Sequence, residues 1–530
     1  MSWQHEVDGI EQRKRLAQEH GGAEAVARQH TQGRLTIRER VAGLVDADSF
    51  REQGPIAGHA ETNEQGQIQT FTPANYVLGV GKIDGRLCVV GGEDFTVRGG
   101  SPSPAGLRKS VFAEELAWRY RVPLIRFLEG GGGSVPRGEG KGGGGGEAAN
   151  ASPRFMSIMQ VMGAVPVVSA AMGAVAGLPA ARLVASHFSV MTRHTSQVMI
   201  GGPALVERAF GQRLSKEELG GPDIHLRSGV VDNVADDEVG VFVQIRRFLS
   251  YLPTNVWEAP PITSSDDNRD RQEPELLSLI PRNRRRAYDM RRLVECVVDR
   301  SSFFELAALY GPSQIVGLAR LNGHPLGVWA NDPAWYAGSM TADGAQKVRR
   351  FIDLCDTFHL PIVCFVDEPG FMIGPEAEQT ATIRHGTATL FAVMQSTVPW
   401  ASVIVRKVYG VAGAVHFGPG GMVFAWPRPR AAHCRLKEVW QSRIVAKSKP
   451  RLIPKLSDAR SKNGLPVNAI PTRKLRRLVS LTLLTHAIPD RCCATGSTLF
   501  SRSCKRTVDR ERIRRGRNFI FWWVQPTLQQ

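Results

Sequence analysis

Residues 81–87 read Gly-Lys-Ile-Asp-Gly-Arg-Leu, and residues 319–325 read Ala-Arg-Leu-Asn-Gly-His-Pro. In each stretch an apolar residue precedes Asp-Gly or Asn-Gly, dipeptides that favour a tight turn between two strands. We therefore predict, at both places, a strand that ends in a turn, followed by a short apolar strand. Equivalent positions of the two stretches differ in number by 238.

The same offset relates many other positions. An amphipathic helix is predicted over 111–121 and again over 349–359, and a buried strand then runs into a Gly-rich turn at 123–133 and 361–374. Two unrelated β-α-β units would also share apolar strands, but a constant offset favours two copies of one α/β domain. The matched pairs are Gly79 and Gly317, Val90 and Val328, Asp94 and Asp332, Leu116 and Leu354, Pro123 and Pro361, Phe127 and Phe365, Glu129 and Asp367, Gly132 and Gly370, and, at an offset of 233, Val165-Pro166 and Val398-Pro399.

The segments around these copies differ in composition. Residues 1–60 are predicted to be helical, with a capping box at Thr36 and Glu39. We expect a first domain over 61–252, a polar, Pro-containing linker over 253–287 and a second domain over 288–426. Residues 427–530 form a basic tail.

The charge of the chain is concentrated in that tail. The 530 residues carry a net charge of +17, but residues 427–530 hold 24 Lys and Arg against 5 Asp and Glu. The rest of the chain is nearly neutral, so nucleic-acid binding is not expected of it. There is no apolar run of membrane-spanning length, no signal peptide and no paired-cysteine motif among the eight cysteines, so a cytoplasmic protein is predicted.

Glycines follow the predicted buried strands in both copies. They lie in Glu129–Ser134 and Asp367–Phe371, and further along in Gly173–Gly177 and Gly410–Ala414. Glycine lets backbone N–H groups approach a ligand, and two such groups can stabilise an oxyanion, although the same residues could form plain tight turns. Walker, nucleophile-elbow and HExxH motifs are absent, and we interpret Gly142–Gly146 as a flexible loop.

The chain resembles the carboxyltransferase (beta) subunits of biotin-dependent acyl-CoA carboxylases, the propionyl-CoA and methylcrotonoyl-CoA carboxylase group, over about residues 30–426. The resemblance rests on separate blocks in family order. These are 33–40, Asp94–Val97 with Gly99–Ser101, 195–203, 218–230, 249–253, Ala330–Pro333, 365–374, Ile383–Gly386 and Arg406–Gly410.

The resemblance implies an α/β fold of two tandem crotonase-like (ClpP/crotonase) ββα superhelix domains. In the family the N-terminal domain binds acyl-CoA, and carboxybiotin carried on another subunit approaches the C-terminal domain of a neighbouring protomer. The expected partners are a biotin carboxylase or biotin carrier subunit and further copies of the chain, a hexamer by resemblance. No membrane, metal or nucleic acid is expected to take part.

The implied chemistry needs two oxyanion holes made of backbone N–H groups. One stabilises the thioester enolate, and the other stabilises the ureido oxyanion that remains when carboxybiotin loses CO2 and that takes the α-proton. Family positions place the first hole at Gly131 and Gly132 and the second at Gly410, Val411 and Ala412. Gly177, Gly370, Phe371 and Gly413 are implied as binding residues for the coenzyme A and biotin groups.

Several side chains in these blocks have two interpretations. Asp367 and Glu368 resemble an acid–base pair, but their adjacency favours a turn or capping role for Asp367. Arg406 and Lys407 could steer coenzyme A phosphates or biotin, or could be solvated. With no third ligand, His187 and His194 are interpreted as structural histidines, not as a metal site.

The tail departs from the family after Trp426. We predict that residues from about 427 are translated out of frame, which would leave the second domain incomplete; the alternative is a genuine basic appendage. Two other functions stay open, namely a biotin-dependent acyl-CoA decarboxylase subunit and an inactive or scaffold protein with a nucleic-acid-binding tail. The sequence does not identify the acyl group.

Overall fold

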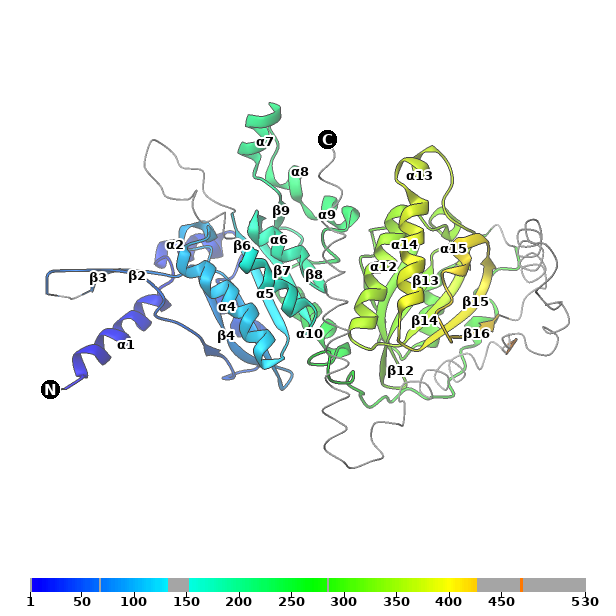
Figure 1. Cartoon of the computed structure of the whole chain (residues 1–530), viewed down its shortest axis with the longest axis horizontal. Coiled ribbons are helices and arrows are strands. Elements are labelled where there is room, and N and C mark those ends of the chain that lie inside the picture. The colour runs from blue at the N-terminus through cyan, green and yellow to red at the C-terminus, as the bar shows by residue number, and fades with distance from the viewer. Residues whose placement is uncertain (1, 66–67, 132–151, 284–285, 427–467, 470–530) are drawn as a thin grey trace. The chain divides into compact units, whose positions relative to one another are not determined.

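The computed structural model describes residues 2–65, 68–131, 152–283, 286–426 and 468–469. These residues form two compact units (Figure 1). Unit 1 contains the described residues up to Leu249, together with Pro253–Glu258. Unit 2 contains Ser250–Leu252 and the described residues from Ala259 onward.

The sheet of unit 1 has the strand order β1-β4-β5-β6-β7-β8-β10, and β9 pairs with β7. β1 and β5 are antiparallel to β4, whereas β6, β7, β8 and β10 continue the sheet in parallel. The strands are β1 (Arg51–Glu52), β4 (Tyr76–Ile83), β5 (Arg86–Glu93), β6 (Leu124–Gly130), β7 (Val167–Ala176), β8 (Phe188–Thr192), β9 (Gln197–Met199) and β10 (Asn233–Ala235).

Helices cover both faces of this sheet. One face packs α4 (Pro104–Tyr120) and α5 (Ser152–Met162) over a core that includes Leu78, Leu116 and Val161. On the other face Phe127 of the sheet meets Phe242 of α10 (Glu238–Tyr251), with ring centroids 5.7 Å apart. The shorter helices are α6 (Leu178–Val184), α7 (Pro203–Phe210), α8 (Lys216–Gly220) and α9 (Pro222–Ser228).

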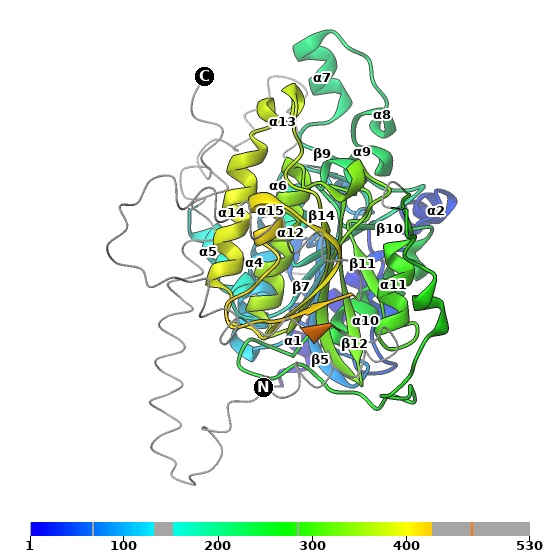
Figure 2. The same cartoon turned by 90° about the vertical axis from the view of Figure 1, so that its right-hand side faces the viewer.

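Unit 2 repeats this plan. Its sheet has the order β11-β12-β13-β14-β15-β16-β17, and α12 (Ala342–Thr357) and α14 (Thr382–Gln395) lie side by side on it (Figures 1 and 2). The strands are β11 (Phe304–Leu306), β12 (Gln314–Leu321), β13 (His324–Asn331), β14 (Ile362–Glu368), β15 (Trp400–Val408), β16 (Met422–Ala425) and β17 (Asn468–Ala469); the other helices are α11 (Met290–Val297), α13 (Pro375–Gln379) and α15 (Gly410–Ala414).

The predicted duplication is confirmed element by element. β4 and β5 correspond to β12 and β13, with the same lengths and the predicted offset in numbering, and β6 corresponds to β14. The hairpin turns are also as predicted: Asp84 and Gly85, like Asn322 and Gly323, have positive φ angles. The predicted helices began too late, because Ser103 and Thr341 cap α4 and α12 well upstream of the predicted starts.

The repeat also extends further towards the N-terminus than the sequence analysis found. With an offset of 253 in numbering, α3 (Ile37–Leu44) and β1 correspond to α11 and β11. The Arg38–Glu52 ion pair (2.6 Å) recurs as Arg291–Glu305 (2.7 Å). The offset changes because, among the described residues, the hairpin of β2 (Gly58–Thr62) and β3 (Ile68–Pro73) exists only in unit 1.

An aspartate holds the turn of each β-hairpin. The Asp46 carboxylate accepts hydrogen bonds from the N–H groups of Asp84 (3.0 Å) and Gly85 (2.8 Å). Asp299, its counterpart in unit 2, accepts from Asn322 and Gly323 in the same way, at 2.8 Å each. Both units therefore stabilise their positive-φ turn with one carboxylate.

The N-terminal segment is only partly as predicted. Residues 1–60 contain α1 (Gln4–Gln18), α2 (Ala23–Thr31) and α3, and the capping box of Thr36 and Glu39 is confirmed. Arg51–Glu52 and Gly58–Thr62 are strands, so the prediction of helix over the whole segment was wrong there. Strand pairing with β4 and β3 overrides the helical pattern.

The predicted boundaries at 252–253 and 287–288, and the prediction of an out-of-frame tail, stay predictions. Most of residues 427–530 lie outside the described residues. The exception is β17, which pairs in parallel with β16 as β10 pairs with β8, so that Asn468 takes the place that Asn233 has in unit 1. No helix in the described part of the chain is long and apolar enough to span a membrane.

Candidate active site

The first predicted oxyanion turn follows β6. Gly131 is half-buried directly after the strand, whereas Gly132 and Gly142–Gly146 lie outside the described residues. Just before the turn, the fully buried Glu129 carboxylate forms ion pairs with Arg34 and Arg40 and accepts a hydrogen bond from Gln29 (2.8 Å). These contacts fix the end of β6 to the N-terminal segment.

The neighbouring strand β7 ends beside the same cluster. A Cβ atom on Gly173 would lie 2.4 Å from the Glu129 carboxylate, so any larger residue there would displace this carboxylate from its position. The strand leads to Gly177, which has a φ of 65° and precedes α6. Gly173–Ala176 thus belong to the strand, and the structure brings Gly131, after β6, and Gly177, after β7, to the ends of neighbouring strands of one sheet.

A cavity of about 340 Å³ lies at this edge of unit 1. Arg34 stacks over the Phe95 ring at 4.9 Å, and both residues line the cavity. Its lining is polar and carries positive charge; it also includes Gln32, Ala174, His194, Thr195, Gln197 and Lys216. Sequence reasoning singled out His194 for another reason and missed Lys216.

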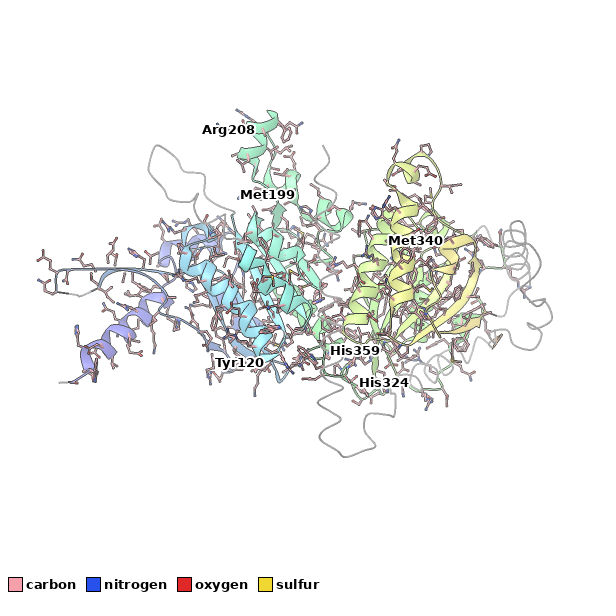
Figure 3. The ribbon with its side chains drawn as sticks, viewed as in Figure 1. Tyr120, Met199, Arg208, His324, Met340 and His359 are labelled. Carbon is pink, nitrogen blue, oxygen red and sulfur yellow. The ribbon has the colours of Figure 1, made fainter. Side chains whose placement is uncertain are left out.

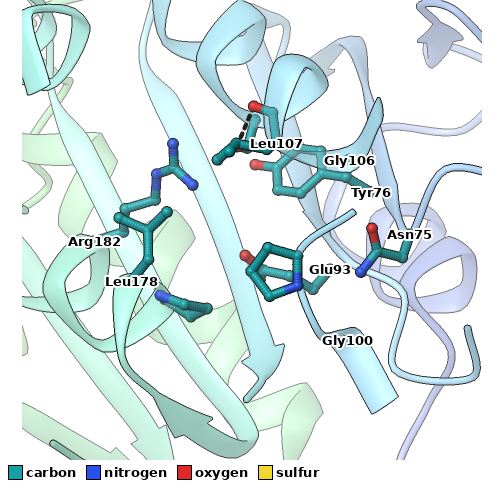
Figure 4. A pocket seen from close by; sticks show the side chains of 11 residues that line it. Asn75, Tyr76, Glu93, Gly100, Gly106, Leu107, Leu178 and Arg182 are labelled. Atoms are coloured by element: carbon teal, nitrogen blue, oxygen red, sulfur yellow. Dashed lines mark hydrogen bonds between the residues drawn. The ribbon is translucent and has the colours of Figure 1, made fainter. Parts of the chain in front are cut away.

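Glu93, at the end of β5, is a buried carboxyl group that the sequence analysis missed. It lines a cavity of about 20 Å³ together with Tyr76 and Arg182 (Figure 4). Its Oε2 atom accepts a hydrogen bond from the Glu129 N–H (3.3 Å). Burial raises the pKa of Glu93 to about 7, although the nearby Arg182 and Arg126 oppose that shift.

We expect Glu93→Gln to stabilise unit 1 above pH 7. Folding raises the Glu93 pKa from 4.5 to about 7, so the cost of its buried charge is absent below pH 4.5 and complete above pH 7. The substitution should raise the free energy of unfolding by about 1–3 kcal/mol at pH 8 and by almost nothing at pH 4.5. Thermal unfolding at both pH values measures this; an equal effect at the two values would contradict it.

The second predicted oxyanion site lies at the start of α15. The first bond of this helix joins Gly413 N–H to Tyr409 O (3.1 Å), and the N–H groups of Gly410, Val411 and Ala412 donate to no other described residue. Gly410 has a φ of 64°, and it and Val411 are exposed, whereas Ala412 and Gly413 are buried. Gly413 is thus already engaged in the helix.

Gly370 and Phe371 form the turn after β14. Gly370, with a φ of 129°, donates its N–H to Glu368 (3.0 Å) and accepts from the N–H of Met340 (3.2 Å), a residue labelled in Figure 3. A Cβ atom on Gly370 would lie 3.9 Å from Tyr409 O, the residue before α15. Phe371 packs against Gly386 of α14.

Asp367 and Glu368 belong to β14, so the turn or capping role expected for Asp367 was wrong. The pairing of β14 with β15 shifts register between Val366 and Glu368, and the two carboxylates make different contacts. Asp367 bonds Arg406 (3.0 Å) and Tyr288 (3.0 Å), and Lys407 lies 3.7 Å away. Arg406 and Lys407 are therefore held by a buried carboxylate.

His187, interpreted as structural in the sequence analysis, and His225 both have backbone partners. His187 accepts the N–H of Val167 (3.0 Å), and His225 lies 2.6 Å from Val198 O. In the described part of the chain, no group of three or more His, Cys, Asp and Glu side chains could hold a metal ion.

Comparison with known proteins agrees with this architecture. The Carboxyl transferase domain family matches residues 28–433. The propionyl-CoA carboxylase carboxyltransferase subunit of Haloferax mediterranei is 34% identical over 438 residues, 82% of this chain and 83% of that protein. The alpha subunit of Veillonella parvula methylmalonyl-CoA decarboxylase is 33% identical over 437 residues, which make up 81% of this chain and 84% of that protein.

Among solved structures, the transcarboxylase 12S hexamer with methylmalonyl-coenzyme A bound is similar, with a TM-score of 0.79 and 26% identity. The match covers 94% of this chain and 98% of that one. The crotonase-like fold implied by the resemblance is therefore confirmed.

Proposed function

Because the chain belongs to the carboxyl transferase family, as a carboxyltransferase of the biotin-dependent acyl-CoA type, we propose that it transfers a carboxyl group between carboxybiotin and a short-chain acyl-CoA such as propionyl-CoA. One observation carries the proposal: each unit ends a buried parallel strand in a glycine turn, beside a second strand that leads into a helix. That is the arrangement in which backbone N–H groups can meet an oxyanion.

In this proposal each unit stabilises one negative charge. The Gly131 and Gly132 N–H groups hold the thioester oxygen of the enolate, and the Gly410, Val411 and Ala412 N–H groups hold the ureido oxygen of biotin. Carboxybiotin supplies the carboxyl group. The chain's own residues orient the two reactants and stabilise the two negative charges. The exposure of Gly410 and Val411, and the lack of any described acceptor for their N–H groups, support this role.

The cavity beside Arg34 fits a part of acyl-CoA. Its polar, positively charged lining suits the phosphates of coenzyme A. Gly177, at a neighbouring strand end, is proposed to contact the same substrate; Gly370, Phe371 and Gly413 are proposed to shape the biotin side.

Lys216→Ala should raise the KM for acyl-CoA about 3- to 10-fold and leave kcat unchanged, because an exposed lysine contributes binding rather than transition-state stabilisation. Lys216→Arg, which keeps the charge, is the control. The effect should shrink at high salt. A fall in kcat with an unchanged KM would show that Lys216 does not bind the substrate.

The biotin is proposed to reside on a separate carrier or biotin carboxylase subunit, and the chain is proposed to act as a homo-oligomer, as the transcarboxylase 12S hexamer does. We propose a cytoplasmic enzyme. Cys88, Cys296, Cys355 and Cys364 are free and buried, as in a reducing compartment.

The test is carboxyl transfer by the purified full chain from methylmalonyl-CoA and from malonyl-CoA to free biotin. Transfer from either supports the proposal and identifies the acyl group. No transfer from either, by a folded chain, would refute it. The decarboxylase alternative rests on the Veillonella relative; activity that depends on sodium and a membrane partner would favour it.

A further inference from the structure

A buried polar network lies behind α15. His416, which is fully buried, follows the helix, and its Nδ1 atom is 3.0 Å from Ala412 O. The ring stacks on Trp329, with centroids 3.9 Å apart, and the His416 carbonyl accepts from Trp400 Nε1 (3.0 Å) and Ser402 Oγ (2.7 Å). This histidine, which follows the predicted oxyanion helix, is thus held on several sides.

The partners determine which nitrogen of His416 carries the proton. A carbonyl oxygen can only accept, so Nδ1 must donate to Ala412. The Nε2 atom lies 3.2 Å from Asn331 Nδ2, an amide nitrogen that can only donate, so Nε2 must be unprotonated. Burial also lowers the pKa of His416 to about 3, and the ring is therefore neutral.

Asn331 connects this histidine to the turn at Gly370. Its Nδ2 group also lies 3.1 Å from Glu368 Oε2 and 3.1 Å from Gln314 Oε1. The other oxygen of Glu368 accepts the N–H groups of Gly370 (3.0 Å) and Met340 (3.2 Å). One continuous network therefore links α15 to the turn after β14.

Unit 1 lacks this network at the equivalent described positions. By the offset of the predicted repeat, Asn331 and Glu368 correspond to Glu93 and Gly130. At the offset of 233 that relates α15 to α6, His416 corresponds to Leu183. The two units share one contact between neighbouring strands. Asn331 accepts the N–H of Asp367 (2.8 Å), as Glu93 accepts the N–H of Glu129. A general folding requirement would be expected in both copies.

We propose that His416, Asn331 and Glu368 are positioning residues for the biotin side of the reaction. His416 holds the Ala412 carbonyl, which orients the N–H groups at the start of α15, and Glu368 holds Gly370 in register with them. This inference rests on the proposed function, but its structural part can be tested without activity.

The test compares His416→Leu, which takes the unit 1 residue, with His416→Asn, whose amide can still donate to Ala412. In the full chain, His416→Leu should lower kcat for transfer from methylmalonyl-CoA to free biotin about 10-fold. Its KM for methylmalonyl-CoA should not change. His416→Asn should recover most of kcat.

Hydrogen exchange gives the second readout. In His416→Leu, amides 408–418 should exchange about 10-fold faster, while amides 175–184 of unit 1 should not change. Thr389→Val is the control, because it removes a buried hydroxyl donor from α14 that bonds Ala345 O (2.8 Å); it should alter neither kcat nor this exchange. If the wild-type chain transfers no carboxyl group, the proposed function fails and exchange still tests the network.

Unchanged exchange at 408–418, or a kcat within about twofold of wild type, would overturn the proposal. So would equal losses in His416→Leu and His416→Asn. If His416→Leu does not fold, Ser402→Ala removes one donor to the His416 carbonyl, and it should shift both readouts in the same direction by a smaller amount. No shift in Ser402→Ala would then refute the proposal.

Discussion

Val411→Pro is expected to lower kcat for carboxyl transfer by about 10²- to 10³-fold, the usual cost of removing one oxyanion donor. Proline lacks the N–H group, and the first turn of a helix tolerates it, because those N–H groups have no partner within the helix. The first bond of α15 is made by Gly413, further along the helix. The Val411 side chain is 46% exposed, so little packing is lost.

Val411→Ala is the matched control, because it shortens the side chain and keeps the N–H group. It should retain kcat within about twofold. Both variants should bind acyl-CoA with the wild-type dissociation constant, since the donor belongs to the biotin side. A Val411→Pro enzyme with wild-type kcat would assign the second oxyanion hole to other residues.

The repeated fold could be predicted because its signals are local. An Asp-Gly or Asn-Gly turn, an apolar strand and an amphipathic helix recur at one offset, and each is visible in a short window. The extension through α3 and β1 was missed because the β2–β3 hairpin shifts the offset from 238 to 253. The sequence did contain a signal for it, namely three pairs of identical residues at the offset of 253: Arg38 and Arg291, Asp46 and Asp299, and Glu52 and Glu305.

Of the candidate site, only the glycine turns could be predicted from the sequence, and the side-chain network could not. The Glu368–Asn331–His416 network joins residues from three separate segments, and no short window contains it. Asp367 was misassigned to a turn because β14 continues through Glu368. The apolar residues of that strand stop at Val366, whereas the strand itself continues through the two buried carboxylates Asp367 and Glu368.

Gly131→Pro is expected to lower kcat by about 10²- to 10³-fold through the acyl-CoA side of the site. The preceding residue is glycine, which accepts the backbone conformation that proline imposes. Gly131→Ala is the matched control, because among the described residues its Cβ atom would meet only Ser101 Oγ, at 3.8 Å, and the N–H group is kept. The alanine variant should therefore remain active.

Comparing the two proline variants separates the two oxyanion holes. If Gly131 stabilises the enolate, Gly131→Pro should weaken the binding of a coenzyme A inhibitor that mimics the enolate charge. Val411→Pro should leave the affinity for this inhibitor unchanged. Acyl-CoA itself should bind both variants about equally, because its ground-state carbonyl carries little charge. Equal inhibitor affinity for Gly131→Pro and Gly131→Ala would show that the N–H group of Gly131 is not a donor. Since Glu129 is fixed by Arg34 and Arg40 in either variant, a loss confined to the proline variant would point to the missing N–H group.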